Sequence, residues 1–300
     1  MSYYNTLILS GGCMKTISTL GSLQYCYETK LLTTIETYVG TSAGAIICFL
    51  LVIGYTPIEI ITYLCVNNVF KDITIDIGGM LNHTGAVSYS IVQDTLEKMT
   101  IQKIGYLPTF TDINNIFKRD LVITTFNYTT KELEYLNFKN TPTMPVLVAL
   151  RMSSSLPLIF EPFLYMNNVY IDGGIAENFP IRYALRLNQP RVLGIIIKFE
   201  QTHNETNDIN ESDETNDTNE SITWDLDSLN ILQYIYNLLA IPLDQNLKNC
   251  LNEIKGNSDM DIISIESSLN PFNFELNTRD KLEYFSDGYN VALNYFIGDN

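Results

Sequence analysis

The pentapeptide Gly-Thr-Ser-Ala-Gly centred on Ser42 lies between two apolar runs of different kinds. The β-branched run Ile35–Val39 precedes it and favours a strand, and the run Ala45–Ile53 follows it and favours a helix. Gly40 and Gly44 allow a sharp turn from strand to helix, with the serine Oγ exposed at the helix N-terminus. This context predicts a nucleophile elbow. An ordinary strand-turn-helix with a serine N-cap has the same pattern, so other segments must separate the two interpretations.

A glycine loop lies upstream, between another predicted strand and helix. Thr6–Leu9 has the pattern of a buried strand, Ser10–Lys15 forms the loop, and Thr16–Tyr27 has a helical pattern. The free amides of such a loop can hold a phosphate or the oxyanion of an acyl-transfer intermediate. The spacing matches neither a P-loop nor a dinucleotide site. Beside a nucleophilic serine the loop predicts an oxyanion hole, with a plain tight turn as the alternative.

An aspartate provides the third candidate. Asp172 ends a short strand pattern and precedes Gly173 and Gly174, a sequence that is by itself only a turn signal. The chain has two histidines, His83 in a polar turn and His203 in an acidic tract. A Ser-His-Asp triad needs a histidine held firmly against the serine, and neither segment offers that. We therefore expect a carboxylate base for the serine, and Asp172 is the best placed.

The glycine loop, the elbow and the Asp-Gly-Gly, in this order, resemble the patatin-like phospholipase family, whose hydrolysis uses a Ser-Asp dyad without histidine. Two further stretches are similar to that family: Ala149–Pro157, like its Ala-Ser-x-Ala-x-Pro segment, and Glu177–Pro180. Together the matches cover roughly residues 4–200. The resemblance implies that Ser42 is the nucleophile and Asp172 the base.

The same resemblance implies that the amides of Gly11, Gly12 and Cys13 are the oxyanion donors. The family's loop usually reads Asp-Gly-Gly-Gly-x-Arg-Gly, and this chain departs from it. Cys13 keeps the amide of the third glycine but restricts φ, so the donor survives only in an allowed backbone region. Lys15, a possible anion contact, keeps the charge of the arginine without its bidentate fork. Thr16 replaces the last glycine. The loop is therefore expected to be functional but altered, in a weakened or specialised enzyme.

The implied reaction is hydrolysis of a fatty-acyl ester through an acyl-enzyme. Asp172 would accept the Ser42 proton as Oγ attacks the ester carbonyl, and water would release the acyl group. General-base help contributes about 10²–10⁴-fold and each oxyanion donor on the order of 10²–10³-fold. Partial desolvation would raise the low basicity of an aspartate. The scheme requires no cofactor and no metal, and the sequence has no Cys/His cluster for one.

Length and composition indicate one α/β domain over residues 1–300, because 300 residues at 46% hydrophobic can bury a large core. The resemblance implies a three-layer α/β/α fold with a central, mostly parallel sheet, a core over residues 4–200 and a C-terminal region over 222–300. Further predicted strands are Leu121–Phe126, Leu133–Phe138, Arg191–Phe199 and Asp261–Ile265, and further helices are a capping box from Thr56 onward, Tyr89–Met99 and Arg279–Phe296.

Two segments after the strand Arg191–Phe199 differ from the globular pattern. Glu200–Ser221 is almost free of apolar residues and is predicted to be a disordered acidic insertion. The net charge of −16 argues against nucleic acid and against simple attraction to anionic lipid, so any peripheral membrane contact would use apolar or local basic features. Trp224–Leu239 has near-helical apolar spacing, which is typical of a core helix and also of a lid or interfacial helix.

Cysteine usage favours a reducing compartment. The five cysteines are scattered without a C-x-x-C pair, and Met1 opens no signal peptide, so we expect reduced thiols and a cytoplasmic protein, with peripheral membrane contact allowed. Cys13 is an alternative nucleophile, but no histidine is near it in sequence.

Three classes of function remain open on the sequence. The first is a lipid acyl hydrolase acting on phospholipid or another fatty-acyl ester. The second is a non-catalytic or partner-activated lipid-binding descendant, suggested by the altered loop. The third is a small-ester esterase or transacylase. Ser42 and Asp172 together argue against a pure binding protein, and the residue types give no indication of an activating protein partner.

Overall fold

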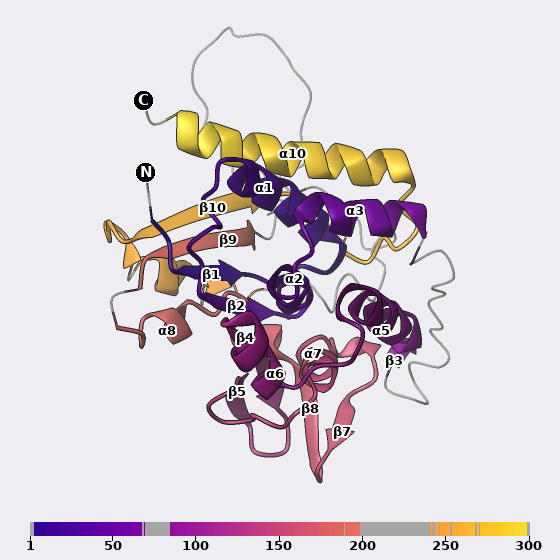
Figure 1. Ribbon diagram of the computed structural model, residues 1–300. Coiled ribbons are helices and arrows are strands. Elements are labelled where there is room, and N and C mark those ends of the chain that lie inside the picture. Colours follow the sequence, from indigo (N-terminus) through magenta and orange to yellow (C-terminus); the bar gives the residue numbers. More distant parts are fainter. Residues whose placement is uncertain are drawn as a thin grey trace, which may run out of the picture.

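A computed structural model describes residues 3–67, 69, 85–188, 190–198, 241, 244–245, 247–252, 254–267, 269 and 271–298 (Figure 1). The predicted acidic insertion over 200–221 and the apolar segment 224–239 lie outside these residues, as do both histidines.

The described residues form an eight-stranded mixed sheet, in the order β10-β9-β1-β2-β4-β8-β7, with β5 paired to β4. Pairing is parallel from β10 through β4 and antiparallel for β8, β7 and β5. The expected α/β class is confirmed, and its parallel part comprises five adjacent strands. The strands are β1 (Thr6–Leu9), β2 (Thr37–Thr41), β4 (Asp120–Asn127), β5 (Glu132–Leu136), β7 (Phe163–Tyr165), β8 (Asn168–Asp172), β9 (Val192–Lys198) and β10 (Met260–Glu266). A separate pair joins β3 (Gly85–Val87) to β6 (Leu158–Phe160).

Side chains alternate between two apolar cores, one on each face of the sheet. Leu7 and Leu9 of β1 belong to the larger core, whereas Ile8 between them belongs to the smaller one. Helices α1, α2, α5, α7 and α10 contribute to the larger core, and α8 contributes to the smaller. The strands are thus buried on both faces, as parallel sheets require. The helices are α1 (Thr16–Glu28), α2 (Ala43–Val52), α3 (Pro57–Val66), α5 (Ser90–Ile104), α6 (Phe110–Asp112), α7 (Val146–Ser153), α8 (Ile181–Ala184) and α10 (Thr278–Ile297), with short helices η1 (Cys13–Lys15), η2 (Ile113–Phe117) and η3 (Gly173–Ile175).

Helices α1 and α10 lie side by side, and their backbones touch (Figure 1). A Cβ added to Gly21 would stand 1.8 Å from the Phe285 carbonyl oxygen, and one added to Gly288 would stand 1.8 Å from that of Ser18. The Ser22 hydroxyl donates a hydrogen bond to the Gly288 carbonyl at 2.6 Å. Glycine is therefore required on both helices for this approach.

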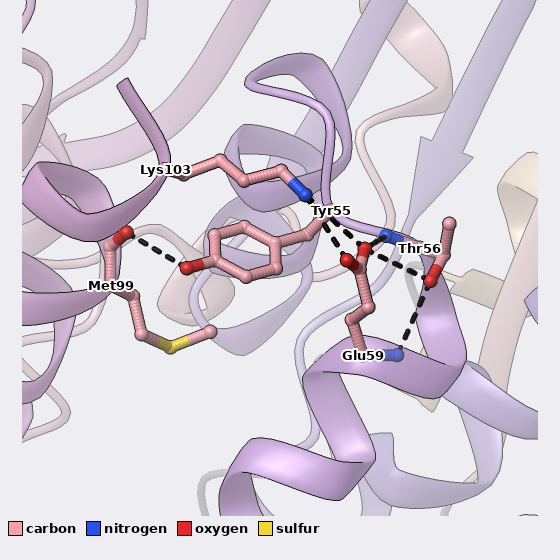
Figure 2. Close-up of polar contacts among 5 residues, drawn as sticks. All are labelled: Tyr55, Thr56, Glu59, Met99 and Lys103. Carbon is pink, nitrogen blue, oxygen red and sulfur yellow. Dashed lines mark hydrogen bonds and ion pairs between the residues drawn. The ribbon is translucent and has the colours of Figure 1, made fainter. Parts of the chain in front are cut away.

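The turn between α2 and α3 is fastened to α5 (Figure 2). Thr56 and Glu59 form the predicted capping box, with the Thr56 amide donating to Glu59 Oε2 at 2.7 Å. Glu59 also pairs with Lys103 of α5 at 3.2 Å, and the Tyr55 hydroxyl donates to the Met99 carbonyl at 2.9 Å. These contacts hold the start of α3 against the last turns of α5.

Within the described residues, no single helix is long and apolar enough to cross a membrane. Helices α2 and α3 would reach that length and composition as a pair, but the chain bends by 116° between them.

Candidate active site

Strand β4 brings the ends of β2 and β8 together. Thr41, the last residue of β2, pairs with Thr124, and Asp172, the last residue of β8, pairs with the next residue, Thr125. The opposite edge of Thr124 and Thr125 is occupied by β5. Strands β2 and β8 therefore follow each other along one edge of β4 and meet end to end. This places Ser42 and Asp172 side by side, although 130 positions separate them in the chain.

Ser42 alone forms the junction between strand and helix. Strand β2 ends at Thr41 and α2 begins at Ala43, so the strand lies two residues later than expected and the helix begins two residues earlier. Ser42 has φ 55° and ψ −126°, a conformation that L residues rarely adopt. Its amide donates to Ser153 Oγ at 2.8 Å, and that hydroxyl donates to the Thr124 carbonyl at 2.6 Å. The strained serine is thus held in place by α7 and β4.

The glycines around the serine are required by close contacts with backbone atoms. A Cβ on Gly44 would stand 2.4 Å from the Ser10 carbonyl oxygen, and one on Gly40 would stand 2.6 Å from the Ala45 nitrogen. The elbow consequently packs directly on the glycine loop. Gly173 is similarly constrained, because its Cβ would stand 2.4 Å from the Thr124 carbonyl oxygen.

Asp172 is buried, with 2% of its surface exposed. Burial raises the pKa of its carboxyl from 3.8 to about 6, whereas hydrogen bonds from the Ser42 side chain and the Gly174 amide lower that pKa. The Gly174 amide lies 2.7 Å from Oδ1. The group therefore remains ionised at neutral pH and is a stronger base than a solvated aspartate.

The glycine loop lies at the same cavity as Ser42 and Asp172. The Gly11 amide, expected as a donor, already donates to the Asn178 carbonyl at 3.2 Å, and the Met14 amide donates to the Pro271 carbonyl at 3.2 Å. The amides of Gly12 and Cys13 have no hydrogen-bond acceptor among the described residues. Both residues line the same cavity as Ser42. The geometry therefore favours Gly12 and Cys13 over Gly11 as oxyanion donors.

Cys13 adopts a left-handed backbone conformation, with φ 49°. Such a conformation costs a non-glycine residue on the order of 1 kcal/mol. Burial raises the pKa of the Cys13 thiol to about 12, so the thiol is neutral at physiological pH and is poorly suited to act as a nucleophile.

Lys15 does not point into the cavity. It is 7% exposed, and its Nζ donates to the Ser267 carbonyl at 2.8 Å, on the segment after β10. The expected contact with a substrate anion is therefore not supported. The ammonium instead ties the end of the glycine loop to the C-terminal part of the chain.

Asn178 is a site residue to which the sequence analysis assigned no role. Its Nδ2 donates to the Gly11 carbonyl at 3.3 Å, and the preceding carbonyl of Glu177 accepts a hydrogen bond from Thr41 Oγ1 at 3.1 Å. Asn178 thus connects the glycine loop to the residues after Asp172. The Glu-Asn-Phe-Pro stretch was the only sequence signal for it.

A cavity of about 180 Å³ opens beside Ser42 and Asp172. Its walls are mostly apolar, and four helices contribute to them, with Ile17 of α1, Ile47 of α2, Ile60 of α3 and Met99 of α5. A second polar pair, the hydroxyls of Tyr89 and Ser154 at 2.7 Å, also lines it. Within the described part of the chain, no group of three or more His, Cys, Asp or Glu residues could hold a metal ion.

Comparison with known proteins identifies similar sequences. A family model described as patatin-like phospholipase matches residues 7–185. The "probable lipid hydrolase 463L" of Invertebrate iridescent virus 6 is 37% identical over 193 residues, which are 63% of this chain and 66% of that protein. An uncharacterized protein, R571, of Acanthamoeba polyphaga mimivirus is 25% identical over 294 residues, covering 96% of this chain and 92% of that protein. The chain thus spans slightly less than two thirds of the lipid hydrolase.

The fold resembles that of a solved structure, VipD from Legionella pneumophila. The TM-score is 0.54 at 17% sequence identity, and the similarity covers 99% of this chain and 67% of VipD. At this level of identity the likeness concerns the fold alone.

Proposed function

Because the chain belongs to the patatin-like phospholipase family, we propose that it is a lipid acyl hydrolase in which Ser42 is the nucleophile and Asp172 the general base. One observation carries the proposal: a strained serine hydroxyl contacts a buried carboxylate at an apolar cavity. A protein that only binds lipid has no need for such a pair.

In the proposed reaction, Ser42 Oγ attacks the ester carbonyl and transfers its proton to Asp172. The amides of Gly12 and Cys13 hold the developing oxyanion. The alcohol leaves with the proton that Asp172 received, and water, activated by the same carboxylate, then releases the fatty acid. The raised pKa of Asp172 brings its basicity closer to what proton transfer at neutral pH requires.

The cavity supports a fatty-acyl ester as the substrate. Its apolar walls suit an acyl chain, and its few polar groups include Ser42 and Asp172. Phospholipid is the preferred substrate class because of the family to which the chain belongs. We place the protein in the cytoplasm, since all five cysteines are free thiols.

Hydrolysis by purified protein tests the proposal. Phospholipid vesicles and a soluble short-chain ester are incubated with the natural chain and with Ser42→Ala, Asp172→Asn and Ser88→Ala, an exposed serine as control. Products are identified by mass. We expect fatty acid from the natural chain and the control alone, with losses of at least about 10²-fold in the two dyad variants.

The same experiment separates the alternatives. Turnover of the soluble ester without release of fatty acid from vesicles would indicate an esterase or transacylase. Equal, negligible rates for all four proteins would indicate a lipid-binding descendant or a missing activating partner. Covalent labelling of Ser42 by a fluorophosphonate, detected as intact mass, distinguishes those two cases. An activated serine reacts with the probe even when the partner needed for turnover is missing, whereas the serine of a lipid-binding descendant does not.

A further inference from the structure

The hairpin formed by β7 and β8 extends beyond the carboxyl ends of the parallel strands, the end of the sheet at which Ser42 lies. Strand β8 runs antiparallel to β4, with Asp172 opposite Thr125 and Tyr170 opposite Asn127, the last residue of β4. The hairpin turn at Met166 and Asn167 therefore lies beyond the carboxyl end of β4. At about 3.3 Å per residue, the turn lies up to roughly 17 Å from Asp172 along β8.

One face of this hairpin is apolar and uncovered. Leu164 is 68% exposed and Met166 77% exposed. The other face packs on the protein, where the rings of Phe163 and Tyr165 are stacked with centroids 6.4 Å apart. Tyr128, 52% exposed, adjoins the apolar face, because its amide donates to the Val169 carbonyl at 2.8 Å.

The turn residues are unusual for their conformation. Met166 and Asn167 both have positive φ, 45° and 64°. Two-residue hairpin turns of this kind favour Asn, Asp and Gly at both positions. A long apolar side chain at this exposed, left-handed position contributes nothing to the core and is available to a contact outside the fold.

The hairpin also differs in charge from the rest of the molecule. Residues 162–171 contain no charged side chain, in a chain whose net charge is −16. The adjoining turn contains Lys131, whose Nζ lies 3.3 Å from the Tyr128 ring centroid. Glu132 follows this lysine and Glu134 accepts a hydrogen bond from Asn127 at 2.8 Å, so negative charge lies at the base of the hairpin and none lies on the hairpin itself. The hairpin alone therefore avoids the repulsion that the acidic surface would experience at an anionic lipid headgroup layer.

We propose that Leu164, Met166 and Tyr128 form the surface by which the protein docks on a phospholipid bilayer. Apolar and aromatic side chains at such a tip insert about 5–10 Å into the headgroup boundary. That depth is less than the distance from the tip to Asp172, so Ser42 stays above the acyl layer. The apolar cavity would then receive an acyl chain lifted out of the bilayer. The lipid nature of the partner rests on the proposed function, but the docking surface does not depend on the dyad.

Binding to vesicles tests this surface separately from catalysis. The natural chain, a Leu164→Glu/Met166→Glu double variant and Ile116→Glu are sedimented with mixed phosphatidylcholine and phosphatidylserine vesicles. Ile116 is the matched control. It is 58% exposed and precedes the amino end of β4, so it lies at the opposite end of the strands from the hairpin turn. Hydrolysis of a soluble short-chain ester is measured on all three proteins.

We expect the double variant to bind vesicles at least about ten-fold more weakly than the natural chain and the control, with unchanged hydrolysis of the soluble ester. Equal vesicle binding by all three proteins would overturn the docking surface, as would an equal loss in the control. A natural chain that is dimeric in sedimentation velocity and a double variant that is monomeric would assign the face to a second copy instead. Vesicle binding without any ester hydrolysis would contradict the proposed function alone.

Discussion

Asn178 and Gly11 are joined by two hydrogen bonds that run in opposite directions: the Gly11 amide donates to the Asn178 carbonyl, and Asn178 Nδ2 donates to the Gly11 carbonyl. The pair fixes the peptide that precedes the proposed oxyanion donors. The adjacent carbonyl of Glu177 is bonded to Thr41 on the elbow, so one short segment positions both halves of the site.

Removing the Asn178 side chain is expected to weaken catalysis more than substrate binding. Without its donor the loop can shift, and small misplacements of catalytic groups cost up to about 10²-fold. We expect kcat of Asn178→Ala on a soluble ester to fall by about 10–10²-fold with little change in KM. Asn249→Ala, at an exposed position, is the control. An unchanged kcat would show that the glycine loop holds itself in place.

The pH dependence of activity is expected to follow Asp172. In the proposed reaction the carboxylate is the active form, and burial raises the pKa of Asp172 to about 6, so kcat/KM should rise through pH 6 and remain level at higher pH. Rates measured from pH 4 to pH 9 give the profile. His83→Asn and His203→Asn should leave it unchanged. Loss of the rise in either variant would identify a histidine base and contradict the proposed dyad.

Replacing Asp172 with asparagine is expected to stabilise the fold at neutral and alkaline pH. The pKa of Asp172 is higher in the folded protein than its ordinary 3.8, so the stability that the protonated acid contributes is present below pH 3.8 and is lost as pH rises through about 6. A shift of this size corresponds to roughly 3 kcal/mol. Thermal unfolding should give a higher Tm for Asp172→Asn at pH 8 and a smaller difference at pH 4. A lower Tm at pH 8 would contradict the burial of an ionised carboxylate.

Substitutions at Cys13 are expected to separate backbone conformation from thiol chemistry. Cys13→Gly keeps the amide and suits φ 49°, whereas a β-branched residue cannot adopt that angle without strain. We expect Cys13→Gly to retain activity and Cys13→Val to lose about 10²-fold in kcat, because the oxyanion donor moves. Loss of activity in Cys13→Gly would instead implicate the thiol.

The elements near the site could be predicted from sequence because their signals are local. Strand β1, the capping box at Thr56 and the elbow at Ser42 each depend on residues within a few positions, and all three appear in the structure. The boundaries of β2 and α2 each shifted by two residues, since tertiary contacts decide where a strand ends.

Contacts between distant segments could not be predicted in the same way. A sequence shows that Lys15 is charged, but its partner Ser267 lies 252 positions away. Asn178 and Gly11 are 167 positions apart. In α10 the apolar Leu282 is 48% exposed, whereas its charged neighbour Lys281 is 1% exposed and donates to the Leu64 carbonyl. A lysine can bury its aliphatic stem when a carbonyl receives its ammonium.

The backbone contact between Gly21 and Phe285 affects where the chain could be shortened. The family match ends at residue 185, but α10 lies against α1, the helix that follows the glycine loop. Removing α10 would expose the surface of α1 around Gly21, where the absent side chain leaves room only for a closely packed helix backbone. Few other segments could cover that surface. We expect a fragment cut at residue 185 to aggregate, even though it contains Ser42, Asp172 and the proposed oxyanion donors. We therefore expect an active fragment of this chain to require α10.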